Sequence, residues 1–187
     1  MIDAVYDACV LYPASLRDFL LRLAAAELVY PFWSDEIRDE WIRSLLQDRP
    51  DLKRNRLERT CREMDLHFPN SLVRGYESIV PTLHLPDPDD RHVLAVAIYV
   101  KAKYIVTSNL KDFPESVLAS HQVEAILPDD FILHVIEYDA KSFITTVKRH
   151  RAVLTRPSQT VDEYLATLEK QCLSKTAAFL RKHKAEI

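Results

Sequence analysis

Short apolar runs alternate with amphipathic stretches over the first two thirds of the chain. Strands are expected at 4–10, 28–33, 104–109 and 123–127, because each is a compact apolar run of strand length. Between these runs, apolar residues recur every three or four positions, which is the spacing of a helix that buries one face. This alternation predicts an α/β fold: a small parallel sheet flanked by helices.

Helix signals stand at the beginnings of the segments that join these strands. Ser15 and Ser34 are placed to cap two helices, and Pro50 and Pro88 are expected in the first turns of two more. The first of these helices has one apolar face, formed by Leu16, Phe19, Leu20 and Leu23. The caps and the apolar spacing agree, so helices are expected at all four places.

The pattern becomes wholly helical from Pro128 onward. Helices are expected at about 129–137, 139–153, 160–171 and 174–184, with a break at 155–160. We therefore predict two parts, an α/β domain over residues 1–137 and an all-helical C-terminal extension over residues 138–187. From Tyr138 onward, ten Lys and Arg residues stand against five Asp and Glu residues, a balance of +5. The whole chain carries −3, so the first part carries −8, and the extension is a candidate contact surface for an acidic partner.

Composition excludes several classes of protein. The chain has 187 residues, of which 48% are hydrophobic, and it contains no apolar run long enough to cross a membrane. Its first residues are acidic where a signal peptide would be basic, so we expect a cytoplasmic protein with no membrane contact. Gly75 is the only glycine, which excludes a phosphate-binding P-loop, a dinucleotide-binding turn and a nucleophile elbow. The three cysteines are far apart, so free thiols are expected rather than a zinc site or a disulfide.

Acidic side chains occur at places that a parallel sheet would bring together. Asp7 lies at the end of the first strand, and Asn109 and Asp112 lie just past "YIVT". Glu40 falls on a helix, on the turn beside Trp41. The next helix opens with three more acids, Asp87, Asp89 and Asp90. Ligands of open parallel sheets bind beyond the carboxyl ends of the strands, so four segments are expected to deliver acids to one rim.

A divalent cation would relieve the repulsion among these carboxylates. Mg²⁺ and Mn²⁺ prefer hard oxygen ligands and keep several waters. An ion held in this way orients a water molecule and stabilises charge on a phosphate oxygen. The acids therefore predict metal-assisted hydrolysis of a phosphodiester bond. Taken singly, each acid also has an ordinary explanation, Glu40 as a solvent-facing helix residue and the others as turn or cap residues. His92 could face the site, although a histidine beside an apolar run is more often a packed core residue.

Four separated segments, taken together, resemble the PIN-domain family, as found in VapC-type toxins. They are "VYDACVLYP", "WSDEIRDEW", "DPDDRHVLAVAI" and "YIVTSNLKDFP", and they follow the family's order over roughly residues 2–127. The resemblance implies a PIN-like nuclease domain over residues 1–137. It also implies a Mg²⁺- or Mn²⁺-dependent endoribonuclease, the toxin of a type II toxin–antitoxin module, with RNA as substrate and an antitoxin as partner.

The resemblance also assigns the pocket. It places the first three catalytic and metal-binding acids on Asp7, Glu40 and Asp90. Many relatives have an aspartate where this chain has Asn109, so either Asn109 or Asp112 would be the fourth ligand. Supporting residues at the same rim would be Asp87, Asp89, Thr107 and Ser108.

Several points stay open from the sequence. Candidate RNA-binding residues are basic and outside the pocket: Arg56, Arg59, Arg62, Lys148, Arg149 and Arg151. An ordinary solvated helix face is the alternative for them. The extension could cover the sheet edge, bind RNA, or contact an antitoxin or a second copy of the chain. Two other functions fit the same acids: a catalytically weak PIN-fold module that binds RNA or protein, and a metal-dependent DNA nuclease.

Overall fold

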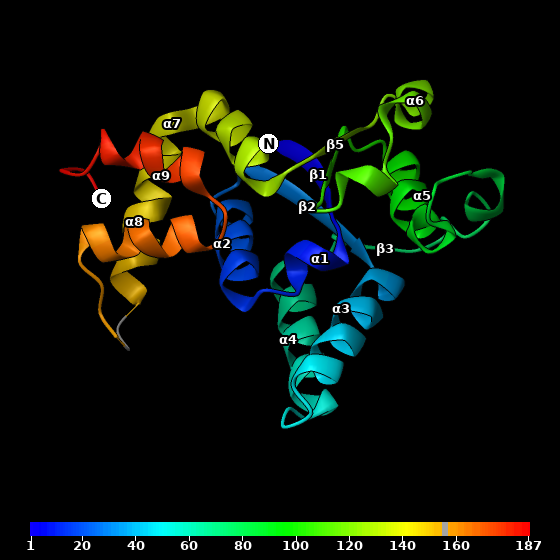
Figure 1. Ribbon diagram of the computed structural model, residues 1–187, viewed down its shortest axis with the longest axis horizontal. Helices are drawn as coiled ribbons and strands as arrows, with labels where there is room; N and C mark the ends of the chain where they lie inside the picture. The colour runs from blue at the N-terminus through cyan, green and yellow to red at the C-terminus, as the bar shows by residue number, and fades with distance from the viewer. Residues whose placement is uncertain (155–156) are drawn as a thin grey trace.

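A five-stranded parallel sheet forms the centre of the computed structural model, which describes residues 1–154 and 157–187. The strands are β1 (Ile2–Tyr6), β2 (Val29–Ser34), β3 (Leu72–Val73), β4 (Tyr104–Val106) and β5 (Glu124–Ile126). Their spatial order is β3-β2-β1-β4-β5, and every neighbouring pair is parallel (Figure 1). The α/β prediction is therefore confirmed. The two-residue strand β3 was not predicted.

Helices connect the strands and cover both faces of the sheet. They are α1 (Ala8–Leu11), α2 (Ala14–Ala25), α3 (Asp35–Asp48), α4 (Arg54–His67), α5 (Arg91–Val100), α6 (Glu115–Leu118), α7 (Pro128–Val153), α8 (Val161–Lys170) and α9 (Ser174–Arg181). Short 3-10 turns are η1 (Val80–Thr82), η2 (Pro88–Asp90), η3 (Leu110–Asp112) and η4 (Ala119–His121). The chain runs from β1 through β2 to β3 in one direction along the sheet, and from β3 to β4 and β5 in the opposite direction. Because parallel crossovers are right-handed, α1–α4 lie on one face of the sheet, and α5 and α6 lie on the other.

The core is centred on β1 and on the aromatic residues that pack against it. Ala4, Val5 and Tyr6 are completely buried, as expected for a central strand covered on both faces. Phe131, in the first turns of α7, packs edge-on against Tyr6 and Tyr104 with ring centroids 6.4 Å and 5.8 Å apart. The beginning of α7 is therefore part of the α/β core.

The C-terminal region is helical, as predicted. The helix α7 is interrupted at Asp139, whose φ of −156° and ψ of 86° are not helical. The Asp139 carboxylate accepts a hydrogen bond from the Ser142 backbone at 3.0 Å, so the second half of α7 begins with its own cap. Helices α8 and α9 then pack together beside α7, at the left of Figure 1. Of the predicted break at 155–160, residues 157–160 are not helical and residues 155–156 lie outside the described residues.

Buried polar contacts attach these last helices to the α/β part. Asp129, at the start of α7, accepts hydrogen bonds from the backbone N–H of Lys175 at 2.7 Å and of Thr176 at 2.9 Å. It also accepts one from the Thr176 hydroxyl at 2.7 Å. His150 lies between Asp18 of α2, 3.2 Å from its Nε2, and the Tyr164 hydroxyl, 2.9 Å from its Nδ1. The predicted boundary between residues 137 and 138 stays a prediction.

The local capping predictions gave mixed results. Ser34 caps α3 by accepting a hydrogen bond from the Ile37 backbone at 3.2 Å, as predicted. Ser15 was wrong as a cap, because α2 already begins at Ala14, with Pro13 before it and no side-chain cap. Pro50 was wrong as a first-turn residue, since α4 begins only at Arg54. Among the described residues, no helix has the length and hydrophobicity needed to cross a lipid bilayer.

Candidate metal-binding acidic site

Asp7 lies at the carboxyl end of the central strand, where neighbouring strands position its carboxylate. Tyr6 of β1 pairs with Val106 of β4, so the residues that follow these two lie side by side. The Thr107 hydroxyl donates to Asp7 Oδ2 at 2.6 Å, and the Cys9 thiol donates to the same oxygen at 3.0 Å. The Ala8 backbone donates to Oδ1 at 2.6 Å. These bonds fix a carboxylate that is only 3% exposed.

The pKa of Asp7 is raised above its ordinary value. Burial is the largest cause, and the negative charge of Glu40 adds to it. The hydrogen bonds from Thr107 and Cys9 act in the opposite direction and offset part of the rise. Burial, followed by the charge of Asp7, also raises the pKa of the Cys9 thiol to about 12, so the thiol remains a donor at neutral pH.

Asp90 lies within the electrostatic field of four other acids. It ends η2 and precedes α5, yet its side chain caps no backbone N–H. The pKa of Asp90 is raised to about 7, first by burial and then by the charges of Asp7, Asp112, Asp87 and Glu40. The structure therefore brings together carboxylates from the four segments that the sequence singled out. Whether these acids are the ligands of an ion stays a prediction.

Asn109 and Asp112 lie together on the loop that follows β4. The Asn109 Nδ2 donates a hydrogen bond to Asp112 Oδ2, and Asp112 is 9% exposed. The Asn109 amide N–H occupies one oxygen of this carboxylate, while the side-chain Oδ1 of Asn109 accepts no hydrogen bond among the described residues. The choice between Asn109 and Asp112 as fourth ligand stays open.

Glu40 reaches the site from α3. Its side chain is 39% exposed, and its Oε2 lies 3.5 Å from Nε2 of His92. His92, in the first turn of α5, is 9% exposed. The interpretation of His92 as a packed core residue was therefore incomplete, because its ring is buried against the acids of α3 as well.

The supporting residues differ in what they contact. Asp87 accepts a hydrogen bond from the Asp89 backbone at 2.9 Å, which is the capping role expected of one aspartate in this run. Asp89 and Ser108 are exposed. The Ser108 backbone donates to the Cys9 sulfur at 3.2 Å, which ties this loop to Asp7 through Cys9.

The donor chemistry of this rim fits a hard divalent cation. Among the described residues, no three His, Cys, Asp or Glu side chains are arranged so that they alone could hold an ion. Mg²⁺, however, is commonly bound by one or two carboxylates, with waters and substrate phosphates as its other ligands. Asp90 suits this role because, besides burial, the charges of Asp7, Asp112, Asp87 and Glu40 raise its pKa. Asp7, Glu40 and Asp90, with Asn109 or Asp112, are the oxygen donors available.

A groove borders the acidic site. Its volume is about 890 Å³, and Cys9 and Ser108 line it beside Asp7. Pro13 and Leu16 of the α/β part and Lys175 of the C-terminal helices also line it. The C-terminal helices thus form one wall of a groove whose other end is lined by Cys9, the hydrogen-bond partner of Asp7.

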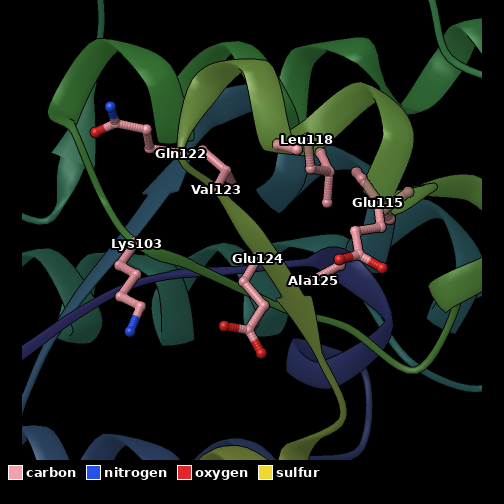
Figure 2. Close-up of a pocket in the computed structure, with 9 residues that line it drawn as sticks. Lys103, Glu115, Leu118, Gln122, Val123, Glu124 and Ala125 are labelled. Carbon is pink, nitrogen blue, oxygen red and sulfur yellow. The ribbon is translucent and has the colours of Figure 1, made fainter.

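A second pocket, of about 460 Å³, lies over the β5 edge of the sheet (Figure 2). Its lining includes Lys103 and Glu124, whose side chains extend in the same direction in this view, and Glu115 beyond them. None of the acids described above lines this pocket. It is separate from the candidate site.

The candidate RNA-binding residues have different surroundings. Five of them are exposed: Arg56, Arg59, Arg62, Lys148 and Arg149. Arg151 is half-buried, and its guanidinium donates to the Gln159 carbonyl at 2.9 Å and to the Ile187 carbonyl at 3.4 Å. The contacts of Arg151 are thus to the chain itself, while the other five side chains are accessible to a ligand.

Sequence reasoning did not assign a role at the site to Cys9. The three cysteines are free, as predicted. The contact of Cys9 with Asp7 was not foreseen. The signal in the sequence was the spacing of the two residues. Asp7 caps α1, and Cys9 lies two positions later in the first turn of that helix, close to the capping carboxylate.

Comparison with known proteins gives two family matches. A family described as "PIN domain" matches residues 3–111, and one described as "VapC50 C-terminal domain" matches residues 128–182. A protein of Mycobacterium tuberculosis named "Putative ribonuclease VapC50" is 40% identical over 73 residues, which cover 37% of this chain and 43% of that protein. The alignment thus spans less than half of that relative. No solved structure matches the chain.

Proposed function

Because the chain belongs to the PIN-domain family, whose match covers more than half of it, we propose that it is a metal-dependent endoribonuclease that hydrolyses phosphodiester bonds in RNA. The observation that carries the proposal is the convergence of four other acids on Asp90, whose pKa is raised to about 7. The name of the relative, a ribonuclease, agrees with the chemistry that these acids support.

In this proposal, Asp7, Glu40 and Asp90 hold Mg²⁺ or Mn²⁺, together with Asn109 or Asp112. When bound, the ion activates water for attack on phosphorus and stabilises the charge that develops on the phosphate. Thr107 and Cys9 hold Asp7 in one orientation. Burial of Asp7 keeps its carboxylate away from bulk water, which strengthens its attraction for a cation.

The groove beside Asp7 is where we place the RNA strand. It begins at Cys9 and Ser108, next to the acids, and it passes the C-terminal helices. The exposed arginines of α4 and Lys148 and Arg149 of α7 lie outside this lining and would contact phosphates farther along the strand. This assignment predicts that RNA affinity falls as the salt concentration rises.

We further propose that the protein is the toxin of a type II toxin–antitoxin module, with a cognate antitoxin as partner. The match of residues 128–182 to the C-terminal domain of a VapC protein supports this proposal. A small DNA-binding protein encoded in the adjacent reading frame would be the expected antitoxin.

The test of the nuclease proposal is substitution of Asp7 by Asn. Loss of this anionic ligand should lower RNA cleavage by more than the roughly 10–100-fold that outer-shell partners contribute. It should also abolish the rise in melting temperature that millimolar Mn²⁺ gives the wild type, because an ion stabilises only a fold that binds it. Asp3→Asn, an exposed aspartate on the same strand, is the matched control and should behave as the wild type.

Three outcomes would contradict the proposal. Full activity of Asp7→Asn would show that the site is elsewhere. Cleavage of DNA but not RNA would favour a DNA nuclease. Neither cleavage nor a Mn²⁺-dependent rise in melting temperature in the wild type would favour a binding module, in which Asn109 at the fourth position has removed catalysis.

A further inference from the structure

We propose that His92 is a positioning residue that holds the Glu40 carboxylate in the acidic site. The proposal rests on the proposed function, because Glu40 is one of the ligands assigned there. It adds to that function a residue that contacts neither the substrate nor the ion.

The position of His92 is set by two helices. His92 belongs to the first turn of α5, two residues after Asp90, and its side chain is 10% exposed. Its ring faces α3, with Nε2 3.5 Å from Glu40 Oε2 and Nδ1 3.9 Å from Glu36 Oε2. Glu36 and Glu40 are one helical turn apart, so they present both carboxylates to the same ring.

The two glutamates differ in how they are held. The Tyr76 hydroxyl donates to Glu36 Oε2 at 3.0 Å, which fixes that side chain. Across the described residues, Glu40 makes no hydrogen bond, and His92 is its one ion-pair partner. His92 is therefore the contact that decides where the Glu40 carboxylate lies.

The ring nitrogen that faces Glu40 must carry a hydrogen, because an ionised carboxylate only accepts. Nε2 and Oε2 are 3.5 Å apart, an ion-pair distance, and we expect the contact to shorten to a hydrogen bond when the site binds its substrate. His92 Nδ1 is buried and has no hydrogen-bond partner. A buried polar atom without a partner has a desolvation cost, which packing alone does not explain.

Without His92, nothing described would keep Glu40 near the other acids. Its negative charge is repelled by Asp7 and Asp90, and the side chain is exposed enough to turn toward solvent. By orienting the Glu40 carboxylate, His92 therefore contributes to metal affinity and to the chemical step. It makes no contact with the RNA, so KM should stay at the wild-type value.

The experiment compares His92→Leu, which removes the donor, with His92→Gln, whose amide N–H replaces it. We expect His92→Leu to lower kcat by roughly 10–100-fold and to weaken Mn²⁺ binding, measured by calorimetry without RNA, by a factor of the same order. His92→Gln should recover most of both losses. The matched control is His134→Leu, which removes an imidazole 3.4 Å from Glu137 on α7, and it should change neither quantity.

A double-mutant cycle on Mn²⁺ affinity tests the route through Glu40. In a Glu40→Ala background, His92→Leu should weaken Mn²⁺ binding no further, because the acceptor oxygens of this side chain are already absent. The proposal is overturned if His92→Leu binds Mn²⁺ as the wild type does, if Gln is no better than Leu, or if the loss persists in full in that background. A wild type that binds no Mn²⁺ and cleaves no RNA overturns the proposed function itself, and this inference with it.

Discussion

Asp90 differs from Asp87 because its side chain caps nothing, and from Asp89 because it is partly buried. Asp87 holds the turn through the Asp89 backbone, and Asp89 is exposed. Asp90 instead lies among other acids, and its pKa is raised to about 7. At neutral pH this carboxyl is therefore only partly ionised in the free protein. A bound cation would complete its ionisation, so metal binding and proton release should be coupled.

This shift predicts how the stability of the metal-free protein depends on pH. The folded-state pKa of Asp90 lies above the ordinary value of 3.8, so the unfolded chain releases this proton first as pH rises. Stability should therefore fall as pH increases from about 4 to about 7, most steeply in the middle of this range, where only the folded state keeps the proton. We expect the melting temperature, measured by scanning calorimetry, to fall over this range in the wild type and to fall less in Asp90→Asn.

Asp3→Asn is the control, because this exposed carboxylate on β1 is not among the charges that raise the pKa of Asp90. Parallel profiles for the wild type and Asp90→Asn would show that this carboxyl does not cause the fall. Millimolar Mn²⁺ should raise the wild-type melting temperature more at pH 8 than at pH 5, because protons compete with the ion.

The sequence identified the acids but not the residues that orient them. Asp7, Glu40 and Asp90 could be located because acids at strand ends and helix starts are visible as a pattern. The partners of Glu40 could not, because the direction of the His92 ring depends on how α5 packs beside α3. The contacts of Cys9 and Thr107 with Asp7 likewise depend on the pairing of β1 with β4.

At the scale of elements, several helix ends use a left-handed residue other than glycine. Lys101 ends α5 with φ of 58°, and Cys172 follows α8 with φ of 62°. The single glycine, Gly75, has φ of 89°, and a Cβ there would lie 3.0 Å from the Tyr99 hydroxyl. Glycine is thus placed where both the backbone angle and a close contact require it.

Substitution of Lys101 by Gly should therefore stabilise the protein. A left-handed conformation costs a residue with a Cβ roughly 1–2 kcal/mol, and glycine avoids this cost but loses more entropy on folding. We expect the free energy of unfolding, measured with urea, to rise by about 1 kcal/mol. Lys148→Gly, at an exposed position inside α7, is the opposite control and should lower it by about 0.5–1 kcal/mol. A loss of stability in Lys101→Gly would contradict this explanation of the helix end.

The elements predicted well were those with a clear period or a side-chain cap. Ser34 and the apolar face of α2 are examples, with Leu16, Phe19, Leu20 and Leu23 all buried. The start of α4 was missed because the chain first makes a turn, in which the Leu52 backbone donates to the Arg49 carbonyl at 3.0 Å. The strand β3 was missed because two residues are too few to show a period.

At the scale of the whole molecule, the C-terminal helices are attached to the α/β part through buried polar groups. Asp129 is 8% exposed and caps the start of α9, while His150 connects α7 with α2. The residues that form these contacts are far apart in sequence, so the sequence predicted the helices but not how they are attached.

Replacing Asp129 by Ala should weaken this attachment. The Thr176 hydroxyl and two backbone N–H groups would lose their acceptor, and leaving buried donors without a partner costs about 1–3 kcal/mol. We expect a lower free energy of unfolding in urea, with Asp129→Asn, which keeps one acceptor oxygen, lying between Ala and wild type. Asp130→Ala is the control, because its pair with Lys175 is on the surface. Equal stability of Asp129→Ala and Asp130→Ala would contradict a special role for Asp129.

The position of Asp129 also affects the order in which the parts of the protein fold during translation. Its acceptor oxygens are translated 46 residues before the donor at Lys175 and 47 residues before the donors at Thr176. On the ribosome, all five strands emerge before these donors do. Asp129 must therefore stay solvated until α9 leaves the exit tunnel. Docking of α9 follows the emergence of the whole sheet.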